Sequence, residues 1–407
     1  MNKFPRSAYV HIPFCHRRCF YCDFAVIPLG NKIESSQGYG SKTIKEYLHF
    51  LHKEILSIKH KSPLSTIYIG GGTPSILCPH QIKDLIKLFK ENYGLDYGTE
   101  ITMEVDPASF NQDDLYGFIN AGINRFSLGA QSFNNQILQN AGRRHLREDV
   151  EKSCLWLKKT YDSGLIKSWS LDLIQNLPLS GFREWQEDLK KTIKFSPPHI
   201  SIYDLNIENG TVFKKLIDLG KLKLPNDDEA FSNSESTNFI LKGSGYSRYE
   251  ISNYCFPGHQ SRHNRVYWSG LGWWSFGQGS TSSPWGEKLT RPRISKEYKE
   301  WVINQCENSL DSSLVNKDFI YKELDEKIML GMRLREGVDI YKLFEEENWE
   351  KKEFEINLKG LLKKWEIFLE SGLLIRNGNR FFLSDPKGME LSNQILISMF
   401  RWWSKIN

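Results

Sequence analysis

Apolar residues in the first two hundred positions follow two alternating patterns. Short runs rich in β-branched residues indicate strands, and longer segments with apolar residues three or four positions apart indicate amphipathic helices. The expected strands are 7–12, 66–69, 100–105, 125–128, 169–174 and 200–205, and the expected helices are 44–59, 81–89, 113–119, 134–140, 149–158 and 184–193.

This regular exchange of strand and helix predicts the fold class. Six consecutive β–α steps imply parallel strands joined by crossover helices. Because a closed barrel of this kind has eight steps, we expect an α/β fold with a partial (β/α)6 barrel and a site at the carboxyl ends of its strands. The pattern alone leaves a flat, doubly wound sheet open as an alternative.

The alternation stops near residue 206, and we expect two further parts. Residues 207–317 form an extension with a helix at 228–241, a strand at 246–252 and a segment rich in Trp, Tyr and Gly. Residues 318–407 form a mainly helical, winged-helix-like domain, because helical segments precede two apolar runs separated by Asn377-Gly378, a strong hairpin signal. The helix before the hairpin has no basic stripe, which favours a packing role over DNA binding.

Composition narrows the class of protein. The chain has 407 residues, more than one core of about 250–300 residues accommodates. A net charge of +5 favours a solvated surface over a nucleic-acid partner. No apolar run reaches the roughly 18 residues of a membrane span, and the N-terminus has no signal-peptide pattern, so we expect a cytoplasmic protein.

The chain has seven cysteines, and three of them fall within eight residues. They are Cys15, Cys19, Cys22, Cys78, Cys154, Cys255 and Cys306. An odd number in a reducing compartment argues against a disulfide framework. We expect the four scattered cysteines to be small buried apolar residues.

The segment from Cys15 to Cys22 carries the strongest chemical signal. Three thiolates in a tight loop after a strand can each bind one iron of a [4Fe–4S] cluster, which leaves the fourth iron open. An open iron can accept a chelate such as the amino and carboxylate groups of a methionine. The alternatives are three unrelated core cysteines and a zinc site with His16 as fourth ligand. The spacing is poor for zinc, and no second cysteine pair exists.

Other polar and glycine residues recur where the expected strands end. The glycines of 70–74 let the backbone approach a ligand closely. Glu104, Gln131 and Asp172 follow later strands, and Arg143 lies in a loop. Carboxylates can hold ribose hydroxyls and an arginine can hold a carboxylate, so one shared ligand explains them better than separate caps or surface groups.

With these residues in place, the sequence resembles the radical S-adenosylmethionine superfamily. Within it, the chain is similar to the branch of oxygen-independent coproporphyrinogen III oxidases and HemW-type heme chaperones. The resemblance covers nearly the whole chain and is carried by YVHIPFCHRRCFYCDF, GGGTPS, EVDP, INRFSLGAQSF, GRRH, DLIQNLP, YDLNIENGTVF, YEISNY, HNRVYW and MLGMRLREGVDI.

The resemblance implies roles for individual residues. Cys15, Cys19 and Cys22 ligate the cluster, and Tyr9 lies beside the methionine-bound iron. The residues implied to line the S-adenosylmethionine pocket are Tyr21, Gly71, Gly72, Thr73, Glu104, Gln131, Arg143 and Asp172. His263, in HNRVYW, is implied to contact heme, and histidine is a common ligand of heme iron.

Three features favour the heme chaperones over the oxidases. Phe24 stands where the oxidases have a further cysteine, only fourteen residues precede Cys15, and HNRVYW matches the heme-binding relatives. There are two departures: 275–281 lacks the histidine that close relatives have there, and Asn176 replaces a glycine.

The resemblance also implies a set of partners. They are heme and an unidentified protein that accepts heme, which can lie at a membrane surface. An electron donor such as flavodoxin or ferredoxin and a second copy of the chain in a homodimer complete the set. The alternative function is radical oxidative decarboxylation of coproporphyrinogen III, which we do not expect of this chain. The sequence also leaves open radical chemistry on an unrelated substrate.

Overall fold

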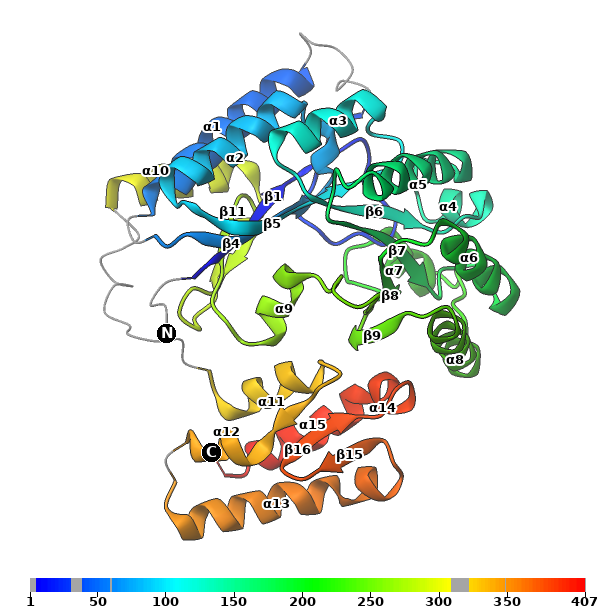
Figure 1. The fold of residues 1–407 in the computed structure, drawn as a ribbon, viewed down its shortest axis with the longest axis vertical. Coiled ribbons are helices and arrows are strands. Elements are labelled where there is room, and N and C mark those ends of the chain that lie inside the picture. Colours follow the sequence, from blue (N-terminus) through cyan, green and yellow to red (C-terminus); the bar gives the residue numbers. More distant parts are fainter. Residues whose placement is uncertain (1–4, 31–38, 59–60, 309–321, 348, 407) are drawn as a thin grey trace.

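The computed structural model describes residues 5–30, 39–58, 61–308, 322–347 and 349–406, which form a barrel-like body and a smaller C-terminal domain (Figure 1). Six neighbouring parallel strands form the centre of the body. They are β1 (Ser7–Ile12), β4 (Leu64–Gly71), β5 (Leu95–Val105), β6 (Arg125–Gln131), β7 (Ser168–Gln175) and β8 (His199–Asp204). The six predicted strands are therefore confirmed, and the sheet does not close.

Crossover helices follow the outer side of this curved sheet (Figure 1). They are α1 (Tyr39–Ser57), α2 (Pro79–Asn92), α3 (Gln112–Ala121), α4 (Asn135–Asn140), α5 (Arg147–Asp162) and α6 (Phe182–Phe195). Their apolar faces bury a continuous core against the strands, with Ile67, Phe126 and Leu171 completely buried. Burial of this apolar surface is the main force that holds the helices on the sheet.

The extension adds strands to both edges of the sheet. β11 (Trp274–Phe276) pairs in parallel with β1, while β10 (Asn253–Cys255) and β9 (Ser247–Glu250) follow β8 in antiparallel register. Trp274 and Phe276 belong to the same buried core as the barrel strands. The extension therefore completes the barrel body rather than packing on its own.

The remaining α-helices and strands of the body, in the part of the chain that the structure describes, are shorter or lie at its margins. They are α7 (Val212–Asp218), α8 (Asp227–Gly243), α9 (Arg262–Trp268), α10 (Ser295–Asn308), β2 (Phe14–Cys15), β3 (Ile27–Pro28), β12 (Thr281–Ser282) and β13 (Leu289–Thr290).

The C-terminal domain has a separate core around Phe344, Trp365 and Trp402. Its elements are α11 (Leu324–Met332), β14 (Val338–Asp339), α12 (Ile340–Glu345), α13 (Lys351–Glu370), β15 (Leu374–Asn377), β16 (Arg380–Leu383), α14 (Lys387–Glu390) and α15 (Ser392–Trp403). The expected hairpin is present, with a two-residue loop in which Gly378 adopts a φ of 61°. Residues 318–321, at the start of the expected domain, lie outside the described residues.

The scattered cysteines differ in their burial. Cys154 and Cys255 are buried as expected, but Cys78 is exposed, so the prediction for Cys78 is wrong. Cys78 precedes the first turn of α2, at the protein surface. The side chain of Cys306 lies outside the described residues.

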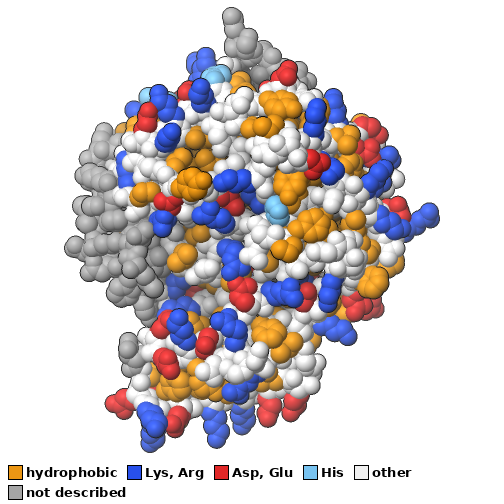
Figure 2. Space-filling model, viewed as in Figure 1, with side chains coloured by type: hydrophobic (Ala, Val, Ile, Leu, Met, Phe, Trp, Pro, Cys, Tyr) orange, Lys and Arg blue, Asp and Glu red, His pale blue; other side chains and the backbone are white. Residues whose placement is uncertain are grey.

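The surface and the helices show two further properties. In the part of the chain that the structure describes, no helix is both long and apolar enough to cross a membrane. Basic and acidic side chains are interspersed on the face shown in Figure 2.

Candidate cofactor site at the carboxyl ends of the strands

A cavity of about 370 Å³ opens where the parallel strands end and where the cysteine loop follows β1. It is lined by all of the residues predicted for the cluster and its ligand except Tyr9. The predicted residues that line it are Cys15, Cys19, Cys22, Tyr21, Gly71, Gly72, Thr73, Glu104, Gln131, Arg143 and Asp172. Segments up to 157 positions apart, from Cys15 to Asp172, thus converge on one site.

The cysteine loop is held by backbone hydrogen bonds to distant segments. The N–H of Phe20 donates to the carbonyl of Ala141 at 3.0 Å, and the carbonyl of Phe20 accepts from the N–H of Phe213 at 3.0 Å. Arg17 Nε donates to the carbonyl of Gly142 at 2.8 Å. The loop is therefore positioned by the α4–α5 connection and by the start of α7.

The three thiols fit a cluster better than a single metal ion. Among the described residues, no three His, Cys, Asp or Glu side chains are placed to share a single ion. In a cluster, by contrast, each thiolate binds a different iron. Thr73 Oγ1 lies 3.6 Å from Cys15 Sγ and Arg143 Nη1 lies 3.5 Å from Cys19 Sγ, so both sulfurs face hydrogen-bond donors.

The electrostatics of the thiols point to a positively charged occupant. The pKa of the Cys15 thiol is raised to about 12, mainly by burial and in part by the neighbouring Cys19 and Cys22. Burial also raises the pKa of Cys22. Crowded thiols of this kind ionise when a metal centre offsets their charge.

Glycine is required where the second strand meets the cysteine loop. A Cβ atom on Gly72 would lie 2.6 Å from the carbonyl oxygen of Phe14 and 2.9 Å from Cys15 Sγ. Gly71 has a φ of +116°, and a Cβ there would lie 2.6 Å from the ring of His11. The backbone can approach the cysteines this closely only without side chains.

Glu104 is a largely buried carboxylate in the cavity wall. It accepts hydrogen bonds from the hydroxyl of Tyr68 at 2.9 Å and from the N–H of Gly71 at 3.0 Å. The pKa of Glu104 is raised to about 7, because the effect of burial, with a contribution from the nearby Asp172, outweighs that of the two hydrogen bonds, which lower it. Near neutral pH this group is therefore poised between its neutral and ionised forms.

Replacing Glu104 by glutamine is expected to stabilise the cofactor-free protein at alkaline pH. Because the folded-state pKa lies above the ordinary value, the wild-type carboxyl group stabilises the fold at low pH and loses this contribution as the pH rises through about 7. The Gln variant should therefore equal wild type near pH 4.5 and exceed it by up to ~3 kcal/mol at pH 8. Urea unfolding at both pH values measures the difference. Glu91→Gln, at an exposed position, is the control, and a pH-independent difference for Glu104→Gln would contradict the expectation.

Arg143 and Asp106 form an ion pair in the cavity wall. Arg143 Nη2 donates to Asp106 Oδ2 at 2.7 Å and to the carbonyl of Gly129 at 2.8 Å. Burial alone would raise the pKa of Asp106, but Arg143 and His145 hold that pKa well below its ordinary value. Asp106 therefore remains ionised and fixes the guanidinium that also reaches Cys19.

Among the cavity residues that the sequence analysis did not predict are the polar side chains of Asp106, Ser127 and Tyr203. Asp106 lies two positions after Glu104 in EVDP, and Ser127 Oγ donates to Asp172 Oδ2 at 2.6 Å. Tyr203 belongs to β8, the last parallel strand. Their place at or near strand ends was a signal that could have identified them.

Gln131 Oε1 and Arg143 Nε are buried in the wall of this cavity and have no hydrogen-bond partner among the described residues. Gln131 also has a φ of 68°, in the left-handed region, beside an irregularity in the pairing of β6 with β7. Backbone strain and unsatisfied buried polar atoms both carry a cost and are concentrated at binding sites. Together they indicate that a polar ligand completes this wall.

Tyr9 lies one layer behind the cavity rather than in its wall. Its ring stacks on Tyr68 with a centroid distance of 6.0 Å, and its hydroxyl is hydrogen-bonded to His11 Nδ1 at 3.1 Å. Through Tyr68 it supports the carboxylate of Glu104.

His263 lies away from the cavity, at the start of α9. Its Nδ1 is hydrogen-bonded to Thr66 Oγ1 and its Nε2 to the hydroxyl of Tyr267, both at 2.8 Å. The side chain is completely buried, stacks on Tyr68, and has a pKa lowered by burial to about 3. In this position the ring holds α9 on the sheet, and heme ligation by His263 stays a prediction that requires α9 to move.

Asn176 adopts the backbone conformation that a glycine would favour. Its φ is 63°, a region that asparagine tolerates better than most residues. Its side chain donates to Asp204 at 2.7 Å and accepts from Asn233 at 2.9 Å. The departure from glycine is thus accommodated, and the side chain fixes the loop after β7.

Comparison with known proteins identifies the family of this chain. Residues 9–168 match the model of the Radical SAM superfamily. The chain is 36% identical to a protein of Synechocystis named heme chaperone HemW, over 97% of this chain and 96% of the relative. It is 32% identical to a heme chaperone HemW of Lactococcus lactis, over 96% of each chain. The structure of coproporphyrinogen III oxidase from Escherichia coli has the same fold, with a TM-score of 0.77 at 21% identity, covering 97% of this chain and 90% of that one.

Proposed function

Because this chain belongs to the heme chaperone HemW family of the radical SAM superfamily, we propose that it binds heme and transfers it to acceptor proteins. The observation that carries the cofactor part of the proposal is the convergence of three thiols and eight other predicted residues on one cavity. We propose that this cavity holds a [4Fe–4S] cluster and S-adenosylmethionine.

Different residues of the cavity bind the cluster and the methionine part of the ligand. Cys15, Cys19 and Cys22 each provide one thiolate to a separate iron. When bound, the cluster supplies an electron and an iron with an open coordination position. Arg143 holds the methionine carboxylate through a guanidinium that Asp106 keeps oriented.

The remaining polar groups hold the nucleoside part of the ligand. Glu104 and Asp172 face the cavity as acceptors for ribose hydroxyls, and Gln131 Oε1 is free to accept a hydrogen bond. Gly71 and Gly72 let the backbone of β4 approach His11 and the cysteine loop closely, in the wall of the cavity.

Phe24 favours heme transfer over oxidation of coproporphyrinogen III. It lines the mouth of the cavity with 61% of its surface exposed. Its side chain offers no thiol where the oxidases, by the resemblance in sequence, have a cysteine.

In the proposed function, an electron donor such as flavodoxin or ferredoxin reduces the cluster, and the acceptor is a cytoplasmic or membrane-surface hemoprotein. A homodimer is compatible with this role.

The test of this function uses the full chain, reconstituted anaerobically with iron and sulfide. Heme titration is expected to show stoichiometric binding, and heme should pass to an apo-hemoprotein. With reductant, S-adenosylmethionine and coproporphyrinogen III, no protoporphyrinogen should form. Absence of stoichiometric heme binding, or formation of protoporphyrinogen, would overturn the proposal.

The cluster is tested separately by a Cys19→Ala variant. It should lose the cluster absorption and most of its iron, because a cubane held by two thiolates lacks a required ligand. Cys78→Ala removes an exposed thiol outside the cavity and is the matched control. Equal iron content in both variants would contradict the assignment.

A further inference from the structure

A chain of buried hydrogen bonds leads away from the cofactor cavity, starting at the carboxylate of Asp172. Ser170 Oγ donates to Asp172 Oδ1 at 2.6 Å, and His199 Nδ1 lies 2.9 Å from Ser170 Oγ. On the other side of the ring, His199 Nε2 lies 2.9 Å from the hydroxyl oxygen of Tyr249. That oxygen accepts a hydrogen bond from the N–H of Ser261 at 3.2 Å. The chain therefore connects Asp172 with Tyr249 through one serine and one histidine.

The register of neighbouring strands brings these groups together. Ser170 of β7 pairs with His199 of β8, and Asp172 follows Ser170 by two positions on the same face of β7. Tyr249 belongs to β9, at the edge of the sheet, and its ring centroid lies 5.6 Å from that of His199. Each of these side chains is at most 7% exposed, so the contacts between them are shielded from solvent.

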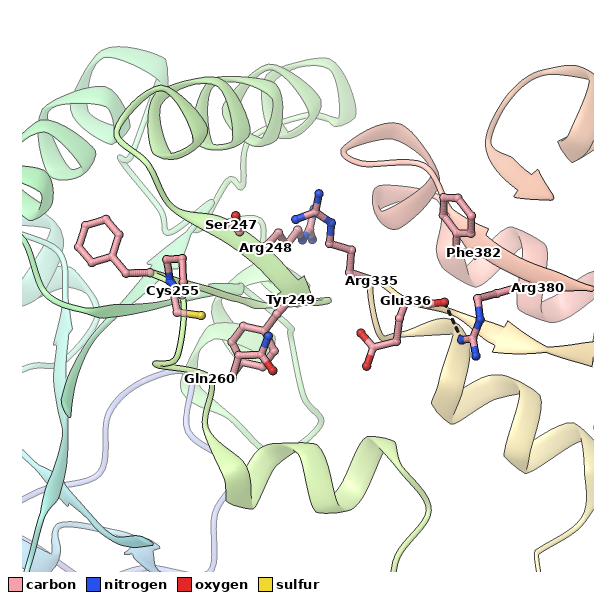
Figure 3. A pocket seen from close by; sticks show the side chains of 11 residues that line it. Ser247, Arg248, Tyr249, Cys255, Gln260, Arg335, Glu336, Arg380 and Phe382 are labelled. Carbon is pink, nitrogen blue, oxygen red and sulfur yellow. Dashed lines mark hydrogen bonds between the residues drawn. The ribbon is translucent and has the colours of Figure 1, made fainter. Parts of the chain in front are cut away.

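The two ends of the chain lie in different cavities. Asp172 lines the cofactor cavity, whereas Tyr249 lines a groove of about 480 Å³ between the barrel body and the C-terminal domain (Figure 3). The opposite wall of this groove includes Arg335 and Arg380. The backbone N–H of Arg335 donates to the carbonyl of Tyr249 at 3.0 Å, so this end of the chain is attached to the C-terminal domain.

When Asp172 is ionised, every hydrogen bond of the chain has one direction. A carboxylate only accepts, so the hydroxyl of Ser170 points to it and Ser170 Oγ accepts from His199 Nδ1–H. His199 Nε2 then accepts from the hydroxyl of Tyr249. His199 is neutral in this arrangement, as expected from burial and the charge of Arg125, which lower its pKa well below the ordinary value.

When Asp172 is neutral, the same contacts persist with their direction reversed. The carboxyl group donates to Ser170 Oγ, Ser170 donates to His199 Nδ1, and His199 Nε2–H donates to the oxygen of Tyr249. On passing to the ionised form, each intermediate group gives one proton and receives one, Asp172 loses one, and solvent in the groove gains one. His199 thereby changes from its Nε2–H to its Nδ1–H tautomer.

The surroundings of Asp172 favour its neutral form more than water does. Burial raises the pKa of Asp172, and hydrogen bonds from Ser127 and Ser170 and the charge of Arg125 oppose this increase without cancelling it. Hydroxyl groups of a ligand that donate to the carboxylate would favour the ionised form. The other titratable groups that face members of the chain are Glu104, Tyr68, Tyr203, His259, Glu250 and Cys255.

We propose that His199 is a positioning residue that transmits the protonation state of Asp172 to the interdomain groove by changing its tautomer. When S-adenosylmethionine occupies the cofactor cavity, its ribose hydroxyls hold Asp172 ionised, and the Tyr249 hydroxyl donates to His199. When the cavity is empty, a neutral Asp172 reverses the chain, and the Tyr249 hydroxyl donates into the groove. This relay rests on the proposed function and adds to it a signal from the cofactor site to the C-terminal domain.

The test follows the ring nitrogens of His199 by ¹⁵N NMR in the full chain labelled on histidine, with His199→Gln to assign the signals. In the cofactor-free protein, His199 should shift from the Nε2–H toward the Nδ1–H tautomer as the pH rises from 4.5 to 9. His263 is the matched internal control, because it is also buried and hydrogen-bonded to a hydroxyl at each nitrogen. Neither of those hydroxyls is hydrogen-bonded to a carboxylate of the described residues, so the tautomer of His263 should not change.

Two variants and the ligand test each link of the chain. Asp172→Asn removes the titrating group and should leave His199 in one tautomer across this pH range. Ser170→Ala interrupts the chain but keeps the carboxylate, so it should have the same effect and decides the question if Asp172→Asn does not fold. In the chain reconstituted with the cluster, S-adenosylmethionine should lower the midpoint of the wild-type change by about one pH unit or more.

The outcomes separate the relay from the proposed function. A His199 tautomer that is independent of pH in wild type, or that still changes in either variant, would overturn the relay. Binding of S-adenosylmethionine without a shift of the midpoint would also overturn the relay and leave the proposed function intact. Failure of the reconstituted chain to bind S-adenosylmethionine would overturn the proposed cofactor role, whatever the tautomer of His199 in the cofactor-free protein.

Discussion

Replacing Arg143 by alanine is expected to lower the free energy of unfolding by about 3–5 kcal/mol and to weaken S-adenosylmethionine binding about tenfold or more. The guanidinium joins Asp106, the carbonyl of Gly129 and Cys19 in a largely buried wall. Without it the carboxylate of Asp106 remains in the wall without its strongest partner. The same change removes the cation proposed to hold the methionine carboxylate.

Chemical denaturation of the cofactor-free protein and calorimetric titration of the reconstituted protein measure these two effects separately. Arg143→Lys keeps the charge but not the forked geometry, so it should recover more stability than affinity. Arg147→Ala is the control. It breaks an exposed ion pair between Arg147 and Glu151, both on α5, and should lower the free energy of unfolding by less than about 1 kcal/mol. If Arg143→Ala behaves like this control, the structural role assigned to Arg143 is wrong.

The sequence predicts much of this wall because parallel strands impose a common geometry. Residues that follow successive strands must meet at one edge of the sheet. Glu104 pairs in register with Ser127, and Gly129 pairs with Asp172, so separate motifs become neighbours. The contribution of Asp106 is harder to foresee, since it acts through Arg143, which a loop brings into the cavity.

Other features depend on contacts that no local pattern encodes. β11 has three residues and pairs with β1 across more than 260 positions, so neither its length nor its spacing identifies it as a strand. His263 was interpreted from a motif, yet the register of α9 against β4 buries its ring against Thr66 and Tyr68. Similarly, the groove that contains Arg335 exists only because two domains meet there.

A buried carboxylate connects the barrel to the extension that completes it. Glu54 of α1 is fully buried and accepts hydrogen bonds from Arg291 Nε at 2.8 Å, the hydroxyl of Tyr298 at 2.7 Å and the N–H of Gly277 at 2.8 Å. Arg291 is 2% exposed. All three donors belong to the extension, so this one side chain anchors β11 and its neighbours to the first helix.

Replacing Glu54 by alanine is therefore expected to lower the free energy of unfolding by about 3–5 kcal/mol, because it leaves the Arg291 charge buried without its carboxylate. Glu46→Ala is a matched control, since Glu46 is also on α1 and pairs with Lys299 of the extension at 2.6 Å, but with side chains 48% and 31% exposed. Solvent screens that pair, so its loss should cost less than about 1 kcal/mol. Urea unfolding of both variants compares the two costs. Equal, small losses would mean that apolar packing of Trp274 and Phe276 alone holds the extension, whereas a large loss confined to Glu54→Ala would show that the buried ion pair fixes the edge of the sheet.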